Sequence, residues 1–272
     1  MSPAALDVLI TTCDRPAALA VTLTSLCGQD MRNFRLIVSD QSKEDPFGCG
    51  ELQAALRVLR LHGHRVILHR HLPRRGMAEH RQFLLDQVEA PYALFLDDDL
   101  ILEPDVIGRI HRAMLEERCG FVGCAVIGLS YLHDVRPHQQ AIEFWERPVH
   151  PEIVRPGTPQ WDRHHLHSAA NLYHVQQRLG LTAQTQRKYH VAWVGACVLY
   201  DTAKLRQVGG FGFWRELPAV HCGEDVLAQV RVLQQFGGCG LIPSGVYHQE
   251  LPTTLIDRSV DAPKILPLEM PV

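Results

Sequence analysis

The chain has 272 residues, 46% of them hydrophobic and 21% charged, a composition typical of globular proteins with an ordinary core. Its formal net charge is −3 at pH 7, so it lacks the excess positive charge with which many proteins bind nucleic acid. No apolar run approaches the roughly 20 residues that cross a bilayer, and the N-terminus lacks the basic region and cleavage site of a signal peptide.

The first half of the chain alternates apolar strands with helices. The strands are expected at 6–11, 34–40, 65–70, 92–97 and 119–128. The helices between them are expected at 14–26, 51–61, 76–88 and 104–117. Asp14 stands where the N-cap of the first helix belongs. Apolar strands joined by crossover helices predict an α/β fold with a mostly parallel sheet that is covered on both faces.

The second half is less regular. Residues 130–190 are rich in His, Arg, Pro and Gln and are predicted to form an irregular insertion without a core of its own. A strand is then expected at 191–200, and helices are expected at 202–208 and 223–235. The residues from 251 onwards carry four prolines, and this tail is expected to be extended or mobile.

Three carboxylates follow the fourth predicted strand directly, in the stretch PYALFLDDDLILE. Asp97, Asp98 and Asp99 repel one another at the end of a buried strand, so a cation must neutralise them. A divalent metal ion would do so while also binding phosphate oxygens. If the strand continues through this triplet, Asp97 and Asp99 share one face and Asp98 points away. The alternative is a carboxylate cluster held by arginines.

The order of these motifs resembles that of the family 2 glycosyltransferases of the GT-A fold. The stretches that carry the resemblance are ITTCDRPAALAVTLTSLCGQ, FRLIVSDQS, RRGMAEHR, LFLDDD, WVGACVLY and GED, spread over residues 6–250. The resemblance implies a GT-A (Rossmann-like) fold with a central, mostly parallel sheet flanked by helices. It also implies an enzyme of the hexosyltransferase type, which moves a sugar with inversion from a nucleoside diphosphate sugar to a hydroxyl acceptor. UDP is the expected nucleotide, and cell-surface glycan or glycoconjugate synthesis is the expected setting.

The resemblance assigns the catalytic and metal-binding roles. Asp225 is the expected base that takes the proton of the acceptor, supported by Glu224, although both could instead merely cap a helix. Trp193 is expected to contact the acceptor or, equally, to fill the core. The expected cofactor is a divalent cation, Mn²⁺ or Mg²⁺, and its expected ligands are Asp99, Asp97 and His248.

The resemblance also assigns the contacts with the nucleotide sugar. Asp40 would recognise the edge of the base, and Arg81 would meet the diphosphate. Gly76 would let the backbone approach the ligand closely. The full set of residues expected to bind the donor is Thr11, Thr12, Asp14, Arg15, Asp40, Gly76, Arg81, Asp97 and Asp98.

A single GT-A domain is therefore predicted over residues 1–250. Its parts are a nucleotide-sugar-binding half, an irregular acceptor-side insertion, and a catalytic and acceptor half, at 1–128, 129–190 and 191–250. The tail, 251–272, follows directly after His248 and could close over the donor as a lid.

The expected partners are a nucleoside diphosphate sugar and a hydroxyl-bearing carbohydrate or glycoconjugate, without nucleic acid. The run HGHRVILHRHLPRRGMAEHR is either a solvated basic face or a patch for anionic lipid head groups, which leaves peripheral contact with the inner face of a membrane open. The eight cysteines form no CxxC pair, so reduced thiols and a cytoplasmic location are expected. Two other classes compete with the transferase: a sugar-nucleotide-binding protein without catalysis, and a phosphatase with an hhhhDxDx motif.

Overall fold

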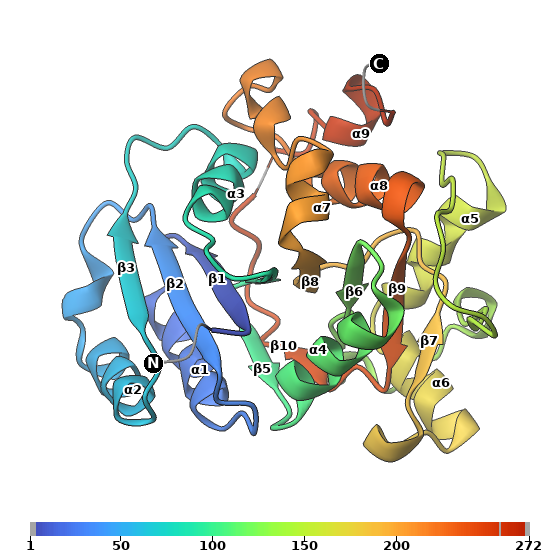
Figure 1. Ribbon diagram of the computed structural model, residues 1–272, viewed down its shortest axis with the longest axis horizontal. Coiled ribbons are helices and arrows are strands. Elements are labelled where there is room, and N and C mark those ends of the chain that lie inside the picture. The colour runs from blue at the N-terminus through green and yellow to red at the C-terminus, as the bar shows by residue number, and fades with distance from the viewer. Residues whose placement is uncertain (1–3, 256, 270–272) are drawn as a thin grey trace.

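An eight-stranded, mostly parallel sheet runs through the centre of the protein (Figure 1). The structure is a computed structural model that describes residues 4–255 and 257–269. Residues 1–3 of the predicted domain and residues 256 and 270–272 of the predicted tail lie outside the described residues. The strands are β1 (Leu6–Thr12), β2 (Phe34–Asp40), β3 (Val66–Arg70), β4 (Tyr92–Leu96), β6 (Phe121–Gly123), β7 (Arg187–Tyr189), β8 (Cys197–Asp201) and β9 (Gly238–Ile242), in the order β3-β2-β1-β4-β8-β6-β9-β7.

The strand β8 and the edge strand β7 run antiparallel to their neighbours. Two further strands, β5 (Leu100–Leu102) and β10 (Val246–His248), form a small antiparallel sheet of their own. Both β5 and β10 continue directly from the ends of the main sheet, so this small sheet lies where the chain leaves β4 and β9.

Helices cover both faces of the main sheet (Figure 1). The helices on the first face are α1 (Pro16–Cys27), α2 (Gly50–Leu61) and α4 (Val106–Glu117). Those on the second face are α3 (Met77–Asp86), α6 (Asn171–Leu179), α7 (Thr202–Gln207) and α8 (Glu224–Phe236). In β1, Val8 and Ile10 join the first core while Leu9 between them joins the second, because alternate side chains of a strand point to opposite faces.

Short helical turns complete the fold. They are α5 (Pro159–Asp162), α9 (Ala262–Ile265), and the 3₁₀ turns η1 (Pro46–Gly48), η2 (Leu129–Tyr131), η3 (Pro137–Gln139), η4 (Arg163–His167), η5 (Ala183–Thr185) and η6 (Gly212–Glu216). No helix within the described ranges has both the length and the apolar composition that crossing a membrane requires.

The predicted α/β fold with a mostly parallel sheet is confirmed, but two strands are shorter than expected. The strand predicted at 119–128 ends at Gly123, because the chain then turns away and Ile127 bridges to Tyr247 of β10. The strand predicted at 191–200 begins only at β8, because Ala196 has φ +70°, outside the extended region.

The predicted insertion and tail contain more regular structure than the sequence suggested. In the insertion, α6 buries Leu172 and Val175, and β7 extends the edge of the main sheet. The nine residues of α6 are mostly polar, but Leu172, Val175 and Leu179 recur at helical spacing, a pattern that the sequence prediction missed. In the tail, α9 packs against α8 with Ala262 fully buried. The prediction of an extended or mobile tail is therefore wrong for residues 262–265.

Candidate active site

The carboxylate triplet, Asp97, Asp98 and Asp99, forms the turn between β4 and β5, at the carboxyl end of a central strand of the main sheet. The strand β5 then pairs with β10, which sets Leu100 opposite His248. This pairing brings His248 Nε2 to 3.4 Å from Asp99 Oδ2. Two residues that the sequence suggested as metal ligands, one from each half of the chain, are therefore neighbours.

The three carboxylates do not alternate as they would in a strand. Asp98 is buried and accepts a hydrogen bond from Thr12 Oγ1 at 2.6 Å. Arg15 Nη1 lies 2.7 Å from Asp99 Oδ2 and 3.6 Å from Asp98 Oδ1, whereas Asp97 faces Arg81. The prediction that Asp97 and Asp99 share a face from which Asp98 points away is therefore wrong, because β4 ends at Leu96 and the chain turns.

Two of these carboxyls have pKa values that move in opposite directions. Burial raises the pKa of Asp98 to about 6, against the opposing effect of the Thr12 hydrogen bond. Burial also acts to raise the pKa of Asp99, but its contacts with His248 and Arg15 outweigh burial and hold that pKa below its usual value. Asp99 is thus the member of the triplet that stays charged most readily.

Arg81 joins the triplet to the acidic pair at the start of α8. Its Nη2 donates to Asp97 Oδ1 at 3.2 Å, and its Nε donates to Glu224 Oε1 at 3.1 Å. Glu224 is buried whereas Asp225, beside it, is partly exposed. Burial, followed by the charge of Asp225, raises the pKa of Glu224 to about 7. The partly exposed Asp225 is therefore better placed than Glu224 to receive a proton from a ligand.

This shift in Glu224 predicts a dependence of stability on pH. The pKa of Glu224 is higher in the folded chain than its ordinary value of 4.5, so the folded state binds the proton more tightly. The free energy of unfolding should therefore fall as the pH rises between about 5 and 7. In Glu224→Gln this fall should be shallower by up to about 1.4 kcal/mol per pH unit, as measured by urea unfolding at several pH values. Glu116→Gln, on the exposed side of α4, is the matched control, and equal slopes in both variants would contradict the prediction.

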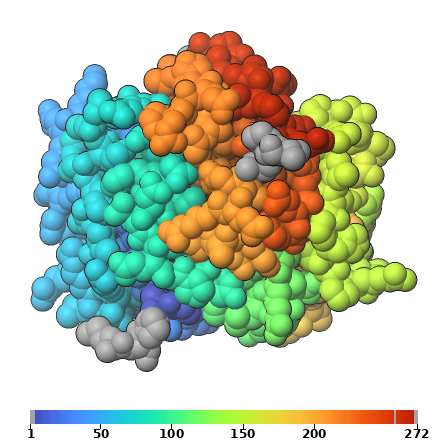
Figure 2. Space-filling model, turned by 45° about the horizontal axis from the view of Figure 1, so that its top comes forward, coloured from blue at the N-terminus to red at the C-terminus, as the bar shows by residue number. Residues whose placement is uncertain are grey.

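The loop before the acidic pair is fixed to the start of α3. His221 Nδ1 donates to the Pro218 carbonyl at 2.8 Å, and its Nε2 accepts from the backbone N–H of Ala78 at 3.1 Å. Gly76 has φ +106°, and a Cβ there would lie 2.5 Å from His221 Cε1. This glycine is needed for the contact between α3 and the loop, a reason other than the predicted approach of backbone to a ligand. Figure 2 shows α3 (teal) directly beside the segment that follows α7 (orange).

The loops after β1 and β2 are tied together by arginines. Asp14 has φ +54° and accepts from Arg74 Nη2 at 2.8 Å. Its prediction as the N-cap is wrong, because the next residue takes that position without a side-chain bond. Asp40 is fully buried and bonds to Ser42 and Arg70. Its carboxylate oxygens therefore hold the loop in place in this structure. They do not face solvent, where the base of a nucleotide could bind them.

Trp193 belongs to an aromatic cluster beside the acidic helix. Its ring stacks on His164 at 4.9 Å between centroids and 13° between planes, and Trp161 lies 4.9 Å away at 59°. The next residue, Val194, is held at both its N–H and its carbonyl by Gln229 of α8. Gln229 follows Asp225 by one helical turn, so both lie on one side of α8. Trp193 is therefore joined, through its chain neighbour Val194, to the helix that begins with the predicted base.

Some residues of the site were not singled out from the sequence. His221 holds the acidic loop, and Glu250 binds Ser130 N–H at 3.0 Å through its carboxylate. In the sequence, the only indication of a role for them is that His221 lies close to the acidic pair and Glu250 lies close to His248. The backbone adds a second signal, because Glu250 and Ala196 have φ of +56° and +70° beside the site. Non-glycine residues in this strained region often cluster at functional sites.

The triplet and His248 would supply only some of the ligands of a divalent ion. Within residues 4–255 and 257–269, no three His, Cys, Asp or Glu side chains gather as a metal site. Metal–ligand distances of about 2.0–2.2 Å put two ligands of one ion roughly 3–3.5 Å apart, and Asp99 and His248 satisfy this at 3.4 Å. An ion with so few protein ligands takes the remainder from phosphates and water. The residues present fit an ion that arrives with a diphosphate.

His248 would have to rearrange before it could bind such an ion. Its Nδ1 accepts the backbone N–H of Glu250 at 2.7 Å, so the proton of the neutral ring lies on Nε2, which faces Asp99. A ligating nitrogen must be free of its proton, and the other nitrogen then becomes a donor. The Glu250 N–H would have to turn away first.

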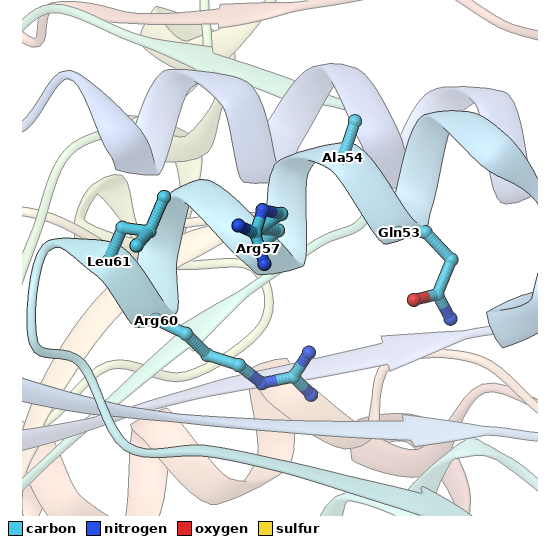
Figure 3. Close-up of a pocket in the computed structure, with 5 residues that line it drawn as sticks. All are labelled: Gln53, Ala54, Arg57, Arg60 and Leu61. Carbon is cyan, nitrogen blue, oxygen red and sulfur yellow. The ribbon is translucent and has the colours of Figure 1, made fainter.

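Two surface hollows lie away from the triplet and the acidic pair. One of about 430 Å³ is formed by five side chains of α2 alone (Figure 3). The other, of about 560 Å³, lies between α1 and α2. Neither is lined by a candidate site residue, so the chemistry of the side chains, and not the size of a hollow, identifies this site. The side chains that line the first hollow are Gln53, Ala54, Arg57, Arg60 and Leu61.

The family model described as "Glycosyl transferase family 2" matches residues 7–177, more than half of the chain. Comparison with curated protein sequences found no match.

Solved structures of similar fold include the following three. The structure of S. aureus TarS 1-349 is 15% identical, with a TM-score of 0.56, over 89% of this chain and 60% of that one. TarS 1-349 in complex with UDP-GlcNAc is 14% identical, with a TM-score of 0.58, over 92% and 60%. The mannosyltransferase PcManGT from Pyrobaculum calidifontis in complex with GDP-Man and Mn²⁺ is 15% identical, with a TM-score of 0.50, over 88% and 57%. This chain therefore spans about 60% of the length of the TarS 1-349 structures, and at these identities the likeness shows the fold.

Proposed function

This chain belongs to glycosyl transferase family 2, and from that premise we propose that it transfers a sugar from a nucleoside diphosphate sugar to a hydroxyl acceptor with inversion. The predictions of the family and of the GT-A fold are confirmed. UDP is the proposed nucleotide, supported by the likeness to a structure that holds UDP-GlcNAc. The acceptor is proposed to be a carbohydrate or glycoconjugate.

The observation that carries this proposal is the pair of bonds from Arg81. One guanidinium bonds both Asp97 of the triplet and Glu224 of the acidic pair, although these residues come from opposite halves of the chain. A transferase needs the leaving diphosphate and the acceptor base on either side of one reacting carbon. Arg81 is a positioning residue that keeps these two groups of carboxylates next to each other.

On the donor side, we propose that Asp99 and Asp97 hold a divalent cation, Mn²⁺ or Mg²⁺, and that His248 joins them once the Glu250 N–H has released its Nδ1. When bound, such an ion would stabilise the negative charge of the leaving diphosphate. The loops after β1 and β2 would surround the nucleotide. The buried side chain of Asp40 would hold the loop after β2 in position. The proposed donor contacts in these loops and on α3 are Thr11, Thr12, Asp14, Arg15, Gly76 and Arg81.

On the acceptor side, we propose that Asp225 removes the proton of the attacking hydroxyl. A carboxylate that acts so must be ionised and must reach the acceptor. Asp225 is partly exposed, and the buried Glu224 beside it is bonded to Arg81. Glu224 therefore orients the acidic pair, while Asp225 accepts the proton from the acceptor hydroxyl. The proposed division of the chain follows: residues 1–128 for the donor, 129–190 for the acceptor, 191–250 for catalysis, and the tail as a lid.

Trp193 provides a test of the acceptor side. Trp193→Ala should raise the KM for the acceptor about three- to tenfold, the range that an aromatic contact contributes, without changing the affinity for the nucleotide. Trp193→Phe should keep the KM for the acceptor close to that of the wild-type protein, because it retains an aromatic face. The KM would be measured with a glycoside found to accept the sugar. A lower melting temperature with an unchanged KM would instead place Trp193 in the core.

A thermal-shift screen tests the function as a whole. Nucleoside diphosphates and their sugars would be added with and without Mn²⁺, since a ligand that binds only the folded state raises the melting temperature. We expect a shift with UDP or a UDP-sugar that requires the metal. Metal-dependent binding without transfer to any acceptor would indicate a binding protein without catalysis, and no binding at all would contradict the proposal.

A further inference from the structure

Arg15 lies between the carboxylate triplet and the tail. Its Nη1 is 2.7 Å from Asp99 Oδ2 and 3.6 Å from Asp98 Oδ1, while its Nη2 donates to the carbonyl of Pro252. Only 16% of its side chain is exposed. The two arms of one guanidinium therefore bind two different segments, the triplet with one and the tail with the other.

Arg15 occupies the position at which a metal ion would neutralise Asp99. Of the other side chains bonded to the triplet, Arg81 serves Asp97, and His248 approaches the same Asp99 oxygen as Arg15. Among the described residues, no third Arg or Lys lies within ion-pair distance of the triplet. An ion that binds Asp99 Oδ2 would therefore compete with Arg15 for this oxygen.

The described parts of the tail, 251–272, have contacts near both the triplet and the acidic pair. Just before the tail, the Gln249 N–H donates to the Asp99 carbonyl at 2.9 Å. Further along, Cys222 N–H donates to the Val260 carbonyl, and Ala262 N–H donates to the Cys222 carbonyl, both at 2.8 Å. Between these contacts, the Arg15 bond to Pro252 joins the tail to the start of α1.

We propose that Arg15 has two roles in this site. It is the resident cation, which neutralises Asp99 when no metal ion is bound, and it is the tether, which holds the tail in place. The inference rests on the proposed function, because it assumes that a metal–diphosphate takes the place of Arg15 at Asp99. A guanidinium has five N–H donors and binds phosphate as readily as carboxylate. Arg15 therefore exchanges Asp99 for the diphosphate with one arm and keeps Pro252 with the other, so the tail stays closed over the donor.

Limited trypsin digestion without metal or nucleotide tests the tether. Arg258, exposed in the tail, is the cleavage site to follow by mass spectrometry. Arg15→Ala should be cut there several times faster than the wild-type protein, because the tail opens more often. Arg74→Ala is the matched control, since Arg74 bonds Asp14 and Gln41 in the neighbouring loop and touches neither the triplet nor the tail. Equal cleavage of Arg15→Ala and Arg74→Ala would overturn the tether.

The affinity for Mn²⁺ alone, measured by electron paramagnetic resonance, tests the resident cation. Without its competitor at Asp99, Arg15→Ala should bind Mn²⁺ about tenfold more tightly than the wild-type protein, and an unchanged affinity would overturn this part. If Arg15→Ala does not fold, Arg15→Lys keeps a charge beside Asp99 but loses the two-armed fork. It should still be cut faster at Arg258, and wild-type protection would count against the tether. Failure of the proposed function would show separately, as no metal-dependent binding of UDP by the wild-type protein.

Discussion

The Asp99→Ala variant is expected to lose metal-dependent binding of the nucleoside diphosphate while keeping its fold. Asp99 lies in a turn outside the two hydrophobic cores, so the fold should persist. The melting temperature should fall, because Arg15 and His248 lose their charged partner. Sugar transfer should fall by roughly three orders of magnitude, because an ion that stabilises the leaving group contributes several kcal/mol. Titration with UDP in the presence and absence of Mn²⁺, and transfer assays with EDTA, measure both effects.

Asp98→Asn is the matched control for this experiment. Asp98 has the same chemistry one residue away, but its carboxyl is buried on Thr12, and an amide oxygen can accept the same hydrogen bond. We expect Asp98→Asn to retain binding that depends on Mn²⁺. Undiminished Mn²⁺ dependence in Asp99→Ala would show that the metal assignment is wrong.

The Asp225→Asn variant is expected to bind the donor normally and to transfer sugar 10²- to 10⁴-fold more slowly, the usual contribution of a general base. The amide keeps the shape of the side chain but cannot take the proton of the acceptor. Because the proposed base would meet the acceptor and not the diphosphate, the affinity for UDP should hardly change. Single-turnover transfer and calorimetric titration of UDP separate these two quantities.

Asp201→Asn serves as the control for Asp225→Asn. Asp201 also stands at the start of a helix, where it caps α7 through the Lys204 N–H. It pairs with Tyr92 at the opposite end of β4 from the triplet, so its substitution should leave transfer unchanged. Weak binding of UDP by Asp225→Asn, with normal transfer at saturation, would refute its role as the base.

Local patterns in the sequence were enough to predict the elements that carry the site. Apolar runs separated by periodic segments predicted the strands β1 to β4 and the helices α1 to α4 close to their observed bounds. The same patterns placed the carboxylate triplet at the end of a buried strand and the acidic pair at the start of a helix. Such patterns are reliable because burial and helical or extended geometry repeat over a few residues.

Patterns of this kind failed where the chain departs from regular geometry. The triplet was expected to alternate, but the strand ends one residue before it. The strand before Tyr200 was expected to be longer, but Ala196 has a positive φ of +70° that an extended strand does not adopt. The tail helix α9 has only four residues and packs against α8, and so its own sequence indicates it poorly. The helical spacing of apolar residues in α6 was present in the sequence and was missed.

The sequence by itself determined the α/β fold, the order of its motifs and the kinds of side chain available for the chemistry. Only the tertiary structure decided which of them meet: Arg15 with Asp99 across 84 positions, and Arg81 with Glu224 across 143. It also paired β5 with β10, which set His248 beside Asp99. The physical reason is that the conformation of a segment depends mainly on its own residues. Contacts between distant segments depend instead on how all the helices and strands pack around a shared core.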